Sequence, residues 1–171
     1  CASGEVICFL NSDDFFKYDT VLSEVAEVFE KENASIVYGD IDIVDRQGGL
    51  IRHWISGELE NGRLEARQLP HPAFFVRRNA LAELGVPFDD NYRISADFKQ
   101  QLQLINQMNK KAVYLAKTLV VMRAGGASNR SFRAIWTGWS ECMRAYYEVT
   151  GRLGVWFVAG KVSRKFIQLI R

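Results

Sequence analysis

Short apolar runs of strand type alternate with amphipathic helical patterns along this 171-residue chain, and the alternation restricts the fold more than any other feature. The clearest strand pattern is residues 35–44, SIVYGDIDIV, in which Ile41 and Ile43 alternate with Asp40 and Asp42. We expect the two aspartates to be exposed on one face of this strand. Strands that alternate with helices, together with one hairpin, predict an α/β domain with a mixed sheet flanked by helices.

The expected elements follow from apolar periodicity, capping residues and turn residues. The expected strands cover residues 5–10, 35–44, 50–55, 73–78, 112–116 and 119–123, with 40–55 as a hairpin. The expected helices cover 19–33, capped by Asp19, then 79–84, 95–108, capped by Ser95, then 131–150 and 155–170.

The bulk properties are those of a globular domain. No apolar run approaches the roughly 18 residues that span a bilayer, and the first ten residues do not read as a secretory signal. Three widely spaced cysteines without a C-x-x-C motif indicate reduced thiols, so we expect a cytoplasmic protein. The strand pattern begins within five residues of Cys1, which leads us to expect a fragment of a longer protein.

Charge is unevenly distributed. Residues 1–122 hold 13 basic and 18 acidic side chains, whereas residues 123–171 hold nine basic residues and only two acidic ones, Glu141 and Glu148. The last 20 residues, 152–171, carry five basic and no acidic side chains among aromatic and aliphatic ones. This composition fits a basic amphipathic helix at an anionic membrane surface, or a helix packed on the domain with a solvated basic face.

Two adjacent aspartates, Asp13 and Asp14, follow the apolar run VICFL of residues 6–10. Adjacent carboxylates repel each other, and a divalent cation between them removes the repulsion. Ligands of open α/β sheets bind beyond the carboxyl ends of the strands, and Mg²⁺ or Mn²⁺ prefers hard oxygen ligands. The spacing alone also fits a solvated turn, because Asn-Ser-Asp-Asp is favourable turn chemistry.

Four stretches in order resemble family 2 glycosyltransferases, which have the GT-A (Rossmann-like) fold and use nucleotide-sugar donors. The stretches are ASGEVICFLNSDD (2–14), VYGDIDIVDRQGGLIR (37–52), LPHPAFFVRRNALAELGVPFDDNYRISADFKQQLQL (69–104) and RAGGASN (123–129). The resemblance implies that residues 1–130 are the C-terminal part of a GT-A domain lacking its N-terminal nucleotide-binding part. Residues 131–171 would then be a C-terminal helical extension.

The resemblance also assigns roles to the acidic residues. Asn11 stands where the family often has the first Asp of its motif, which leaves Asp13 and Asp14 to bind. Asp13 would contact the donor ribose or the metal, and Asp14 would coordinate the metal that bridges the diphosphate. Asp97, in the sequence ISADFKQQ, would be the catalytic base of an inverting transfer. On its residues alone, Asp97 would be interpreted as a first-turn acidic residue favoured by the helix dipole, and only the resemblance favours the catalytic role.

Two further groups of residues each have a structural and a functional interpretation. His71, between two prolines, is a structural histidine or, as the resemblance implies, a donor or acceptor contact. The glycine loop that follows the last strand is a plain turn, or it closes over the donor phosphates through backbone N–H groups. Its candidate donor-binding residues are Arg123, Gly125, Gly126 and Ser128.

We therefore expect an inverting glycosyltransferase that uses Mg²⁺ or Mn²⁺, in cell-surface polysaccharide synthesis. Its partners would be a nucleotide-sugar donor and a saccharide or lipid-linked acceptor, without nucleic acid. It would be cytoplasmic, with peripheral contact to the inner face of the membrane through residues 152–171. The alternatives are a non-catalytic module that retains the scaffold and a phosphate-transfer enzyme, although no phosphate-accepting signature accompanies the aspartate pair.

Overall fold

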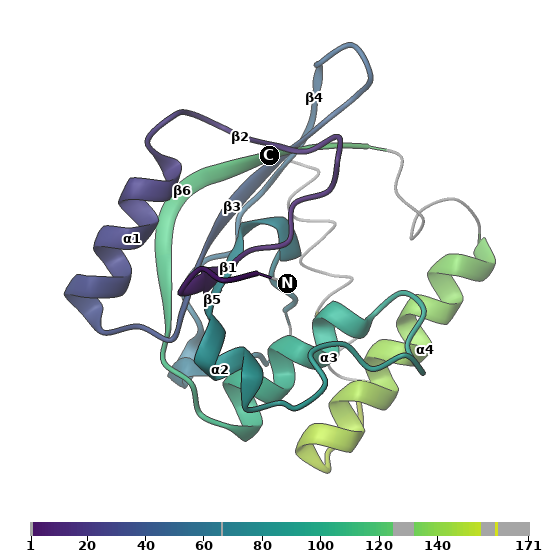
Figure 1. Ribbon diagram of the computed structural model, residues 1–171. Coiled ribbons are helices and arrows are strands. Elements are labelled where there is room, and N and C mark those ends of the chain that lie inside the picture. The colour runs from purple at the N-terminus through teal and green to yellow at the C-terminus, as the bar shows by residue number, and fades with distance from the viewer. Residues whose placement is uncertain (1, 66, 125–131, 155–159, 161–171) are drawn as a thin grey trace.

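The computed structural model describes residues 2–65, 67–124, 132–154 and 160. A six-stranded mixed sheet has the order β1–β5–β3–β6–β2, with β4 paired to β3 (Figure 1). Strands β3 and β6 run parallel and the other pairs are antiparallel, so the carboxyl ends of β3 and β6 lie at one edge. The strands are β1 (Val6–Ile7), β2 (Phe15–Phe16), β3 (Ile36–Val44), β4 (Leu50–Trp54), β5 (Phe74–Arg77) and β6 (Ala112–Arg123).

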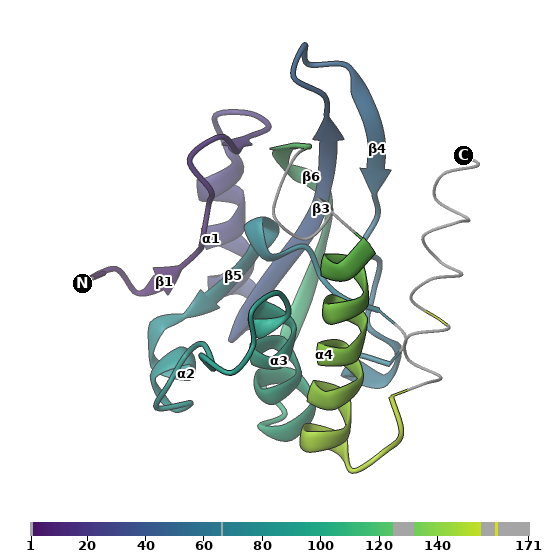
Figure 2. The ribbon, with the colours of Figure 1, turned by 90° about the vertical axis from the view of Figure 1, so that its right-hand side faces the viewer.

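Helices cover both faces of the sheet. Helix α1 packs on one face, and α2, α3 and α4 lie on the other, with α3 and α4 side by side (Figures 1 and 2). None of the helices in the described part of the chain is long and apolar enough to cross a membrane. The α-helices are α1 (Val21–Glu32), α2 (Arg78–Ala82), α3 (Ala96–Leu102) and α4 (Phe132–Thr150). The shorter helical segments are η1 (Glu60–Gly62), η2 (His71–Ala73) and the π-helical η3 (Gln103–Gln107).

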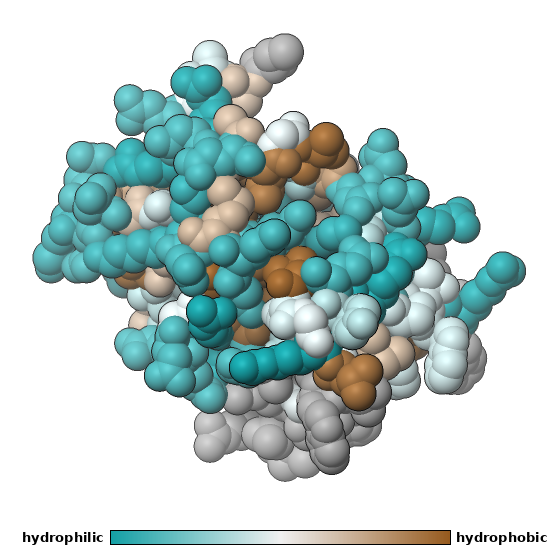
Figure 3. All heavy atoms as spheres, turned by 90° about the horizontal axis from the view of Figure 1, so that it is seen from below, coloured by the Kyte–Doolittle hydropathy of each residue, from teal (hydrophilic) through white to brown (hydrophobic). Residues whose placement is uncertain are grey.

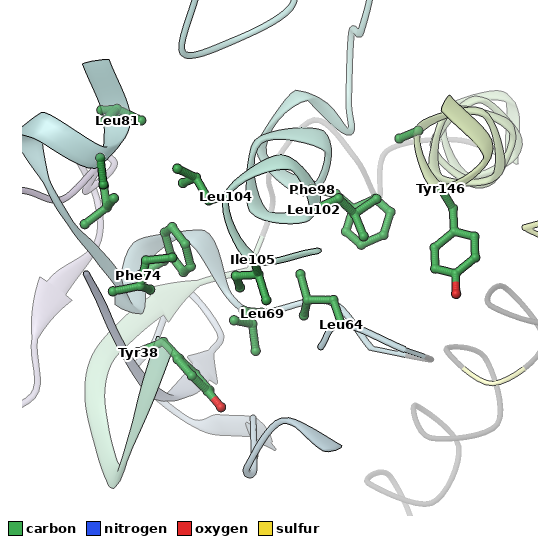
Figure 4. Packing of buried hydrophobic residues seen from close by; sticks show 14 of the residues in the cluster. Tyr38, Leu64, Leu69, Phe74, Leu81, Phe98, Leu102, Leu104, Ile105 and Tyr146 are labelled. Atoms are coloured by element: carbon green, nitrogen blue, oxygen red, sulfur yellow. The ribbon is translucent and has the colours of Figure 1, made fainter. Parts of the chain in front are cut away.

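The alternation of side chains along β3 divides the core into two clusters. Val37 packs with α1, whereas Tyr38 packs with the layer of α2, α3 and α4. Leu69 and Ile105 fill the space between Tyr38 and α3, and Tyr146 extends this cluster to α4 (Figure 4). Burial of each large apolar side chain stabilises the fold by about 1.5–3 kcal/mol. Seen from below, the surface is mainly hydrophilic with small apolar areas (Figure 3).

Most expected elements are present, but the strand expected at residues 5–10 is much shorter. Only Val6–Ile7 pair with β5, and Phe9 and Leu10 are 40% and 38% exposed. The chain turns at once, because the N–H of Asp14 donates to the carbonyl of Asn11 at 3.1 Å. The chain then forms β2, which pairs with β6. The segment therefore contributes two short strands joined by a turn, instead of one long buried strand.

The two strands expected at 112–116 and 119–123 are a single strand, β6. Between the pairs Tyr38↔Tyr114 and Ile41↔Val120, β6 holds more residues than β3, so it bulges instead of breaking. Gly39 permits the bulge, because a Cβ there would lie 2.5 Å from Leu119 Cδ1.

The expectation that Asp40 and Asp42 are exposed is wrong, since both are buried. Asp40 accepts hydrogen bonds from the Ser56 N–H and the Tyr114 hydroxyl, each at 2.8 Å. Burial and the bond to Asp40 raise the pKa of Tyr114. A buried carboxylate is tolerated here because its oxygens are satisfied by specific donors.

The buried carboxylate of Asp42 is balanced by neighbouring basic side chains. Its two carboxylate oxygens lie 2.9 Å from Lys17 Nζ and 2.6 Å from His53 Nδ1. Burial alone would raise the pKa of Asp42, but Lys17 and His53 outweigh it and the pKa lies below its usual value.

Helix α4 confirms the helix expected at 131–150, and its residues share the cluster of α2 and α3. The division of the chain at residue 130 stays a prediction. The helix expected at 155–170 lies outside the described residues, apart from residue 160.

Candidate active site

The aspartate pair lies where β2 meets the carboxyl end of β6. Phe15 pairs with Val121, which places Asp14 beside Arg123, and Asp14 is buried whereas Asp13 is exposed. The Arg123 N–H donates to Asp14 Oδ1 at 3.3 Å. The pair is therefore at the carboxyl edge of the sheet, delivered there by a turn and a short antiparallel strand.

Asn11 connects Asp14 to His71. Its Nδ2 donates to Asp14 Oδ2 at 2.8 Å and lies 3.5 Å from His71 Nε2. With Nε2 as the acceptor, the ring proton is on Nδ1, which lies 3.9 Å from Asp97 Oδ2. These contacts form a continuous row from Asp14 through Asn11 and His71 to Asp97, and the row joins the two carboxylates that the sequence singled out.

Asp97 occupies the first turn of α3, with a side chain that is 22% exposed. Gln68 Nε2 donates to Asp97 Oδ2 at 3.2 Å, so Asp97 is approached from the segment that also carries His71. The buried amide of Gln101 holds this segment by bonding both the N–H and the carbonyl of Leu69. Gln101 of α3 therefore fixes the backbone next to Gln68.

The loop of η2 is fixed from the other side by Cys8. Its thiol donates to the carbonyl of Pro72 at 3.3 Å, next to His71. Burial raises the pKa of the Cys8 thiol to about 12, so it is a protonated, packed side chain at neutral pH.

Ser95 precedes α3 as expected, but its side chain does not cap the helix. Its hydroxyl donates to the Gly138 carbonyl at 3.1 Å, and its N–H donates to Glu141 Oε2 at 2.9 Å. Glu141 of α4 therefore holds the residue before the helix, and the Ser95 side chain bonds α4 instead of capping α3.

The residues at the sheet edge fit a divalent cation held jointly with phosphate. In the described part of the chain no three His, Cys, Asp or Glu side chains are grouped to hold a metal alone. Mg²⁺ is commonly bound by one or two carboxylates together with substrate phosphates. Each oxygen of Asp14 accepts one of the bonds described above, which leaves further lone pairs, and Asp13 is exposed beside it.

The structure brings together Asn11, Asp14, His71, Asp97 and the backbone of Arg123. The other glycine-loop candidates, Gly125, Gly126 and Ser128, lie outside the described residues. Sequence reasoning missed two residues, Gln68 and Glu141. The signal for Glu141 was present, because it is one of two acidic residues in a strongly basic segment, whereas Gln68 stands in an irregular polar stretch.

Solved structures with the same architecture define the class of fold. The structure of Staphylococcus aureus TarS 1–349 in complex with UDP has a TM-score of 0.57 at 13% identity, covering 97% of this chain and 48% of that one. The complex of TarS 1–349 with UDP-GlcNAc has a TM-score of 0.59 at 12% identity, covering 97% and 50%. The fold is that of the GT-A glycosyltransferases, of which the chain covers a part.

Sequence comparison gives the family. Residues 1–85 match the profile described as glycosyl transferase family 2. A PGL/p-HBAD biosynthesis glycosyltransferase of Mycobacterium bovis and one of Mycobacterium tuberculosis are each 32% identical over 99 residues, or 57% of this chain. The chain spans 36% of the length of these relatives. It belongs to glycosyl transferase family 2.

Proposed function

We propose that the protein containing this chain transfers a sugar from a nucleotide-sugar donor to an acceptor hydroxyl, with inversion at the anomeric carbon. The observation that carries the proposal is the row of contacts from Asp14 to Asp97. The row supports the proposal because it joins Asp14, the residue proposed for the leaving-group side, to Asp97, the proposed base. The names of the mycobacterial relatives and the UDP and UDP-GlcNAc complexes of TarS support the reaction class.

Asp97 would act as the general base. An acceptor hydroxyl attacks the anomeric carbon from the face opposite the diphosphate, its proton passes to the Asp97 carboxylate, and the bond to the nucleoside diphosphate breaks with its electron pair. One in-line displacement inverts the configuration. His71 and Gln68, both directed at Asp97 Oδ2, would hold the carboxylate toward the acceptor.

Asp14, with Asp13, would hold Mg²⁺ or Mn²⁺. When bound, such a cation supplies Lewis-acid stabilisation of the negative charge on the departing diphosphate. Asn11 fixes Asp14 through one carboxylate oxygen, and the backbone of Arg123 fixes the other. Arg123, Gly125, Gly126 and Ser128 would bind the donor phosphates.

The acceptor would be a saccharide or a lipid-linked saccharide in cell-surface polysaccharide synthesis. The motivation is the basic, aromatic segment 152–171, which suits peripheral contact with an anionic membrane. Vesicle co-sedimentation with and without anionic lipid tests this contact.

Turnover of a nucleotide-sugar panel by the complete gene product, with Mg²⁺ or Mn²⁺, tests the function. We expect transfer or slow hydrolysis of one donor. Asp14→Ala should weaken both donor binding and turnover, whereas Asp19→Ala, at an exposed position before α1, should change neither. Donor binding without turnover, in the presence of acceptors, would instead indicate a non-catalytic module.

A further inference from the structure

The three residues that lead into α3 are held by one side chain from α4. Glu141 Oε1 accepts the N–H of Arg93, and Glu141 Oε2 accepts the N–H groups of Ile94 and Ser95, each at 2.9 Å. Glu141 is 7% exposed. Burial opposes the charge of this carboxylate, but the three N–H donors outweigh burial and lower the pKa of Glu141.

The backbone of α4 is in close contact with the same residues. The Ser95 hydroxyl donates to the Gly138 carbonyl, and a Cβ at position 138 would lie 3.3 Å from Ile94 Cγ2. Asp97 follows Ser95 by two residues, within the first turn of α3. Where Asp97 stands relative to His71 therefore depends on α4.

We infer that Glu141 is a positioning residue for sugar transfer. By fixing the N–H groups of residues 93–95, it sets the first turn of α3 and directs the Asp97 carboxylate toward His71 and Gln68. The inference rests on the proposed function, because it gives Glu141 its role through Asp97. Glu141 does not touch the reacting groups; it acts through the backbone of residues 93–95.

The substitution Glu141→Gln tests the role with almost no change in volume. Glutamine has one acceptor oxygen, so its NH₂ group must face at least one of the three backbone N–H groups. The entry to α3 should then shift, and small misplacements of a reacting group cost up to about 100-fold in rate. We expect kcat to fall by about tenfold or more, with the donor KM within about twofold of wild type.

Glu24→Gln on α1 is the matched control. Glu24 also accepts three hydrogen bonds, from Tyr18, Thr20 and Lys117, but it lies on the opposite face of the sheet. The Glu24→Gln substitution should lower the melting temperature without lowering kcat. Equal losses of kcat in both variants, or an unchanged kcat in Glu141→Gln, would overturn the inference.

A double variant isolates the route through Asp97. If Glu141 acts only by positioning Asp97, Asp97→Asn with Glu141→Gln should be no slower than Asp97→Asn alone. Independent, multiplying losses would contradict the inference.

Hydrogen exchange separates this inference from the proposed function. Exchange at Arg93, Ile94 and Ser95 should accelerate about tenfold or more in Glu141→Gln and not in Glu24→Gln. If exchange at these amides accelerates in Glu141→Gln but the wild type transfers no sugar, Glu141 does hold residues 93–95 and the proposed function fails. If the wild type transfers sugar but exchange at these amides does not accelerate in Glu141→Gln, the inference about Glu141 fails and the proposed function stands.

Discussion

His71 and Asn11 give the candidate site its continuity at the scale of single residues. Asn11 stands where the family often has a carboxylate. Unlike a carboxylate, its amide NH₂ group can donate a hydrogen bond to Asp14, and the same group faces His71. A neutral amide also avoids adding a third negative charge beside Asp13 and Asp14. The departure from the family pattern is thus consistent with binding at this site.

Asn11→Ala should weaken the metal-dependent binding of UDP. Loss of one hydrogen bond to a charged group costs about 1.5–3 kcal/mol at most, so we expect the dissociation constant to rise about tenfold. Calorimetric titration of UDP with Mn²⁺ measures it. Asn79→Ala, at an exposed position in α2, is the control, and an Asn11 variant that binds as tightly as the control would refute this role.

Cys8 should be chemically inert in the folded protein. With a pKa raised to about 12, its thiolate is scarce at pH 8, and the thiol is bonded to the Pro72 carbonyl. Iodoacetamide should label Cys8 only after unfolding, as followed by peptide mass spectrometry. A Ser3→Cys variant gives the rate of an exposed thiol, and labelling of Cys8 at that rate in the native state would contradict the assignment.

At the scale of elements, the parallel pair of β3 and β6 depends on a glycine. A Cβ at Gly39 would lie 2.5 Å from Leu119 Cδ1 and 2.9 Å from the Lys117 carbonyl. Gly39→Ala should therefore destabilise the fold by about 1–3 kcal/mol through overpacking, measured by urea unfolding. Gly4→Ala, whose Cβ would meet only the Val6 carbonyl at 3.5 Å, should be close to neutral. A neutral Gly39→Ala would mean that β6 does not bulge here.

The contact between α4 and α3 should be sensitive to acid. The pKa of Glu141 is lower in the folded state than its ordinary value of 4.5, so its stabilising contribution is complete above that value and is lost as pH falls below it. The melting temperature of wild type should exceed that of Glu141→Gln near pH 6, and the gap should narrow toward about pH 3. A gap that is independent of pH would contradict this assignment.

Elements with a strong local pattern could be predicted from the sequence. Helix α1 and the β3–β4 hairpin follow from periodicity and turn residues, and so does the position of Asp97 in the first turn of a helix. The bulge in β6 and the short β1 depend on pairing between distant strands, which local periodicity does not encode. The bond of Glu141 to residues 93–95 joins segments almost 50 residues apart and has no local signal beyond an isolated acidic residue.

At the scale of the whole molecule, the sheet separates two layers of helices, and one of these layers carries Asp97. Helix α1 covers one face, while α2, α3 and α4 cover the other (Figure 2). Contacts through His71 and Asn11 connect Asp97 of α3 to Asp14 at the edge of the sheet. The alternating pattern of Asp40 and Asp42 was misread, because the groups that satisfy these buried carboxylates come from other segments of the chain, which local periodicity does not show. The family assignment rests on the sequence comparison, and the proposed reaction rests on the geometry of the site.

Transfer by Asp97→Asn at saturating donor tests the central proposal most directly. Removal of a general base costs about 10²- to 10⁴-fold in rate, so we expect kcat to fall within that range. The dissociation constant for UDP with Mn²⁺ should stay within about twofold of wild type, because the proposed role of Asp97 is toward the acceptor. An Asp97→Asn protein that transfers sugar at the wild-type rate would contradict the proposal.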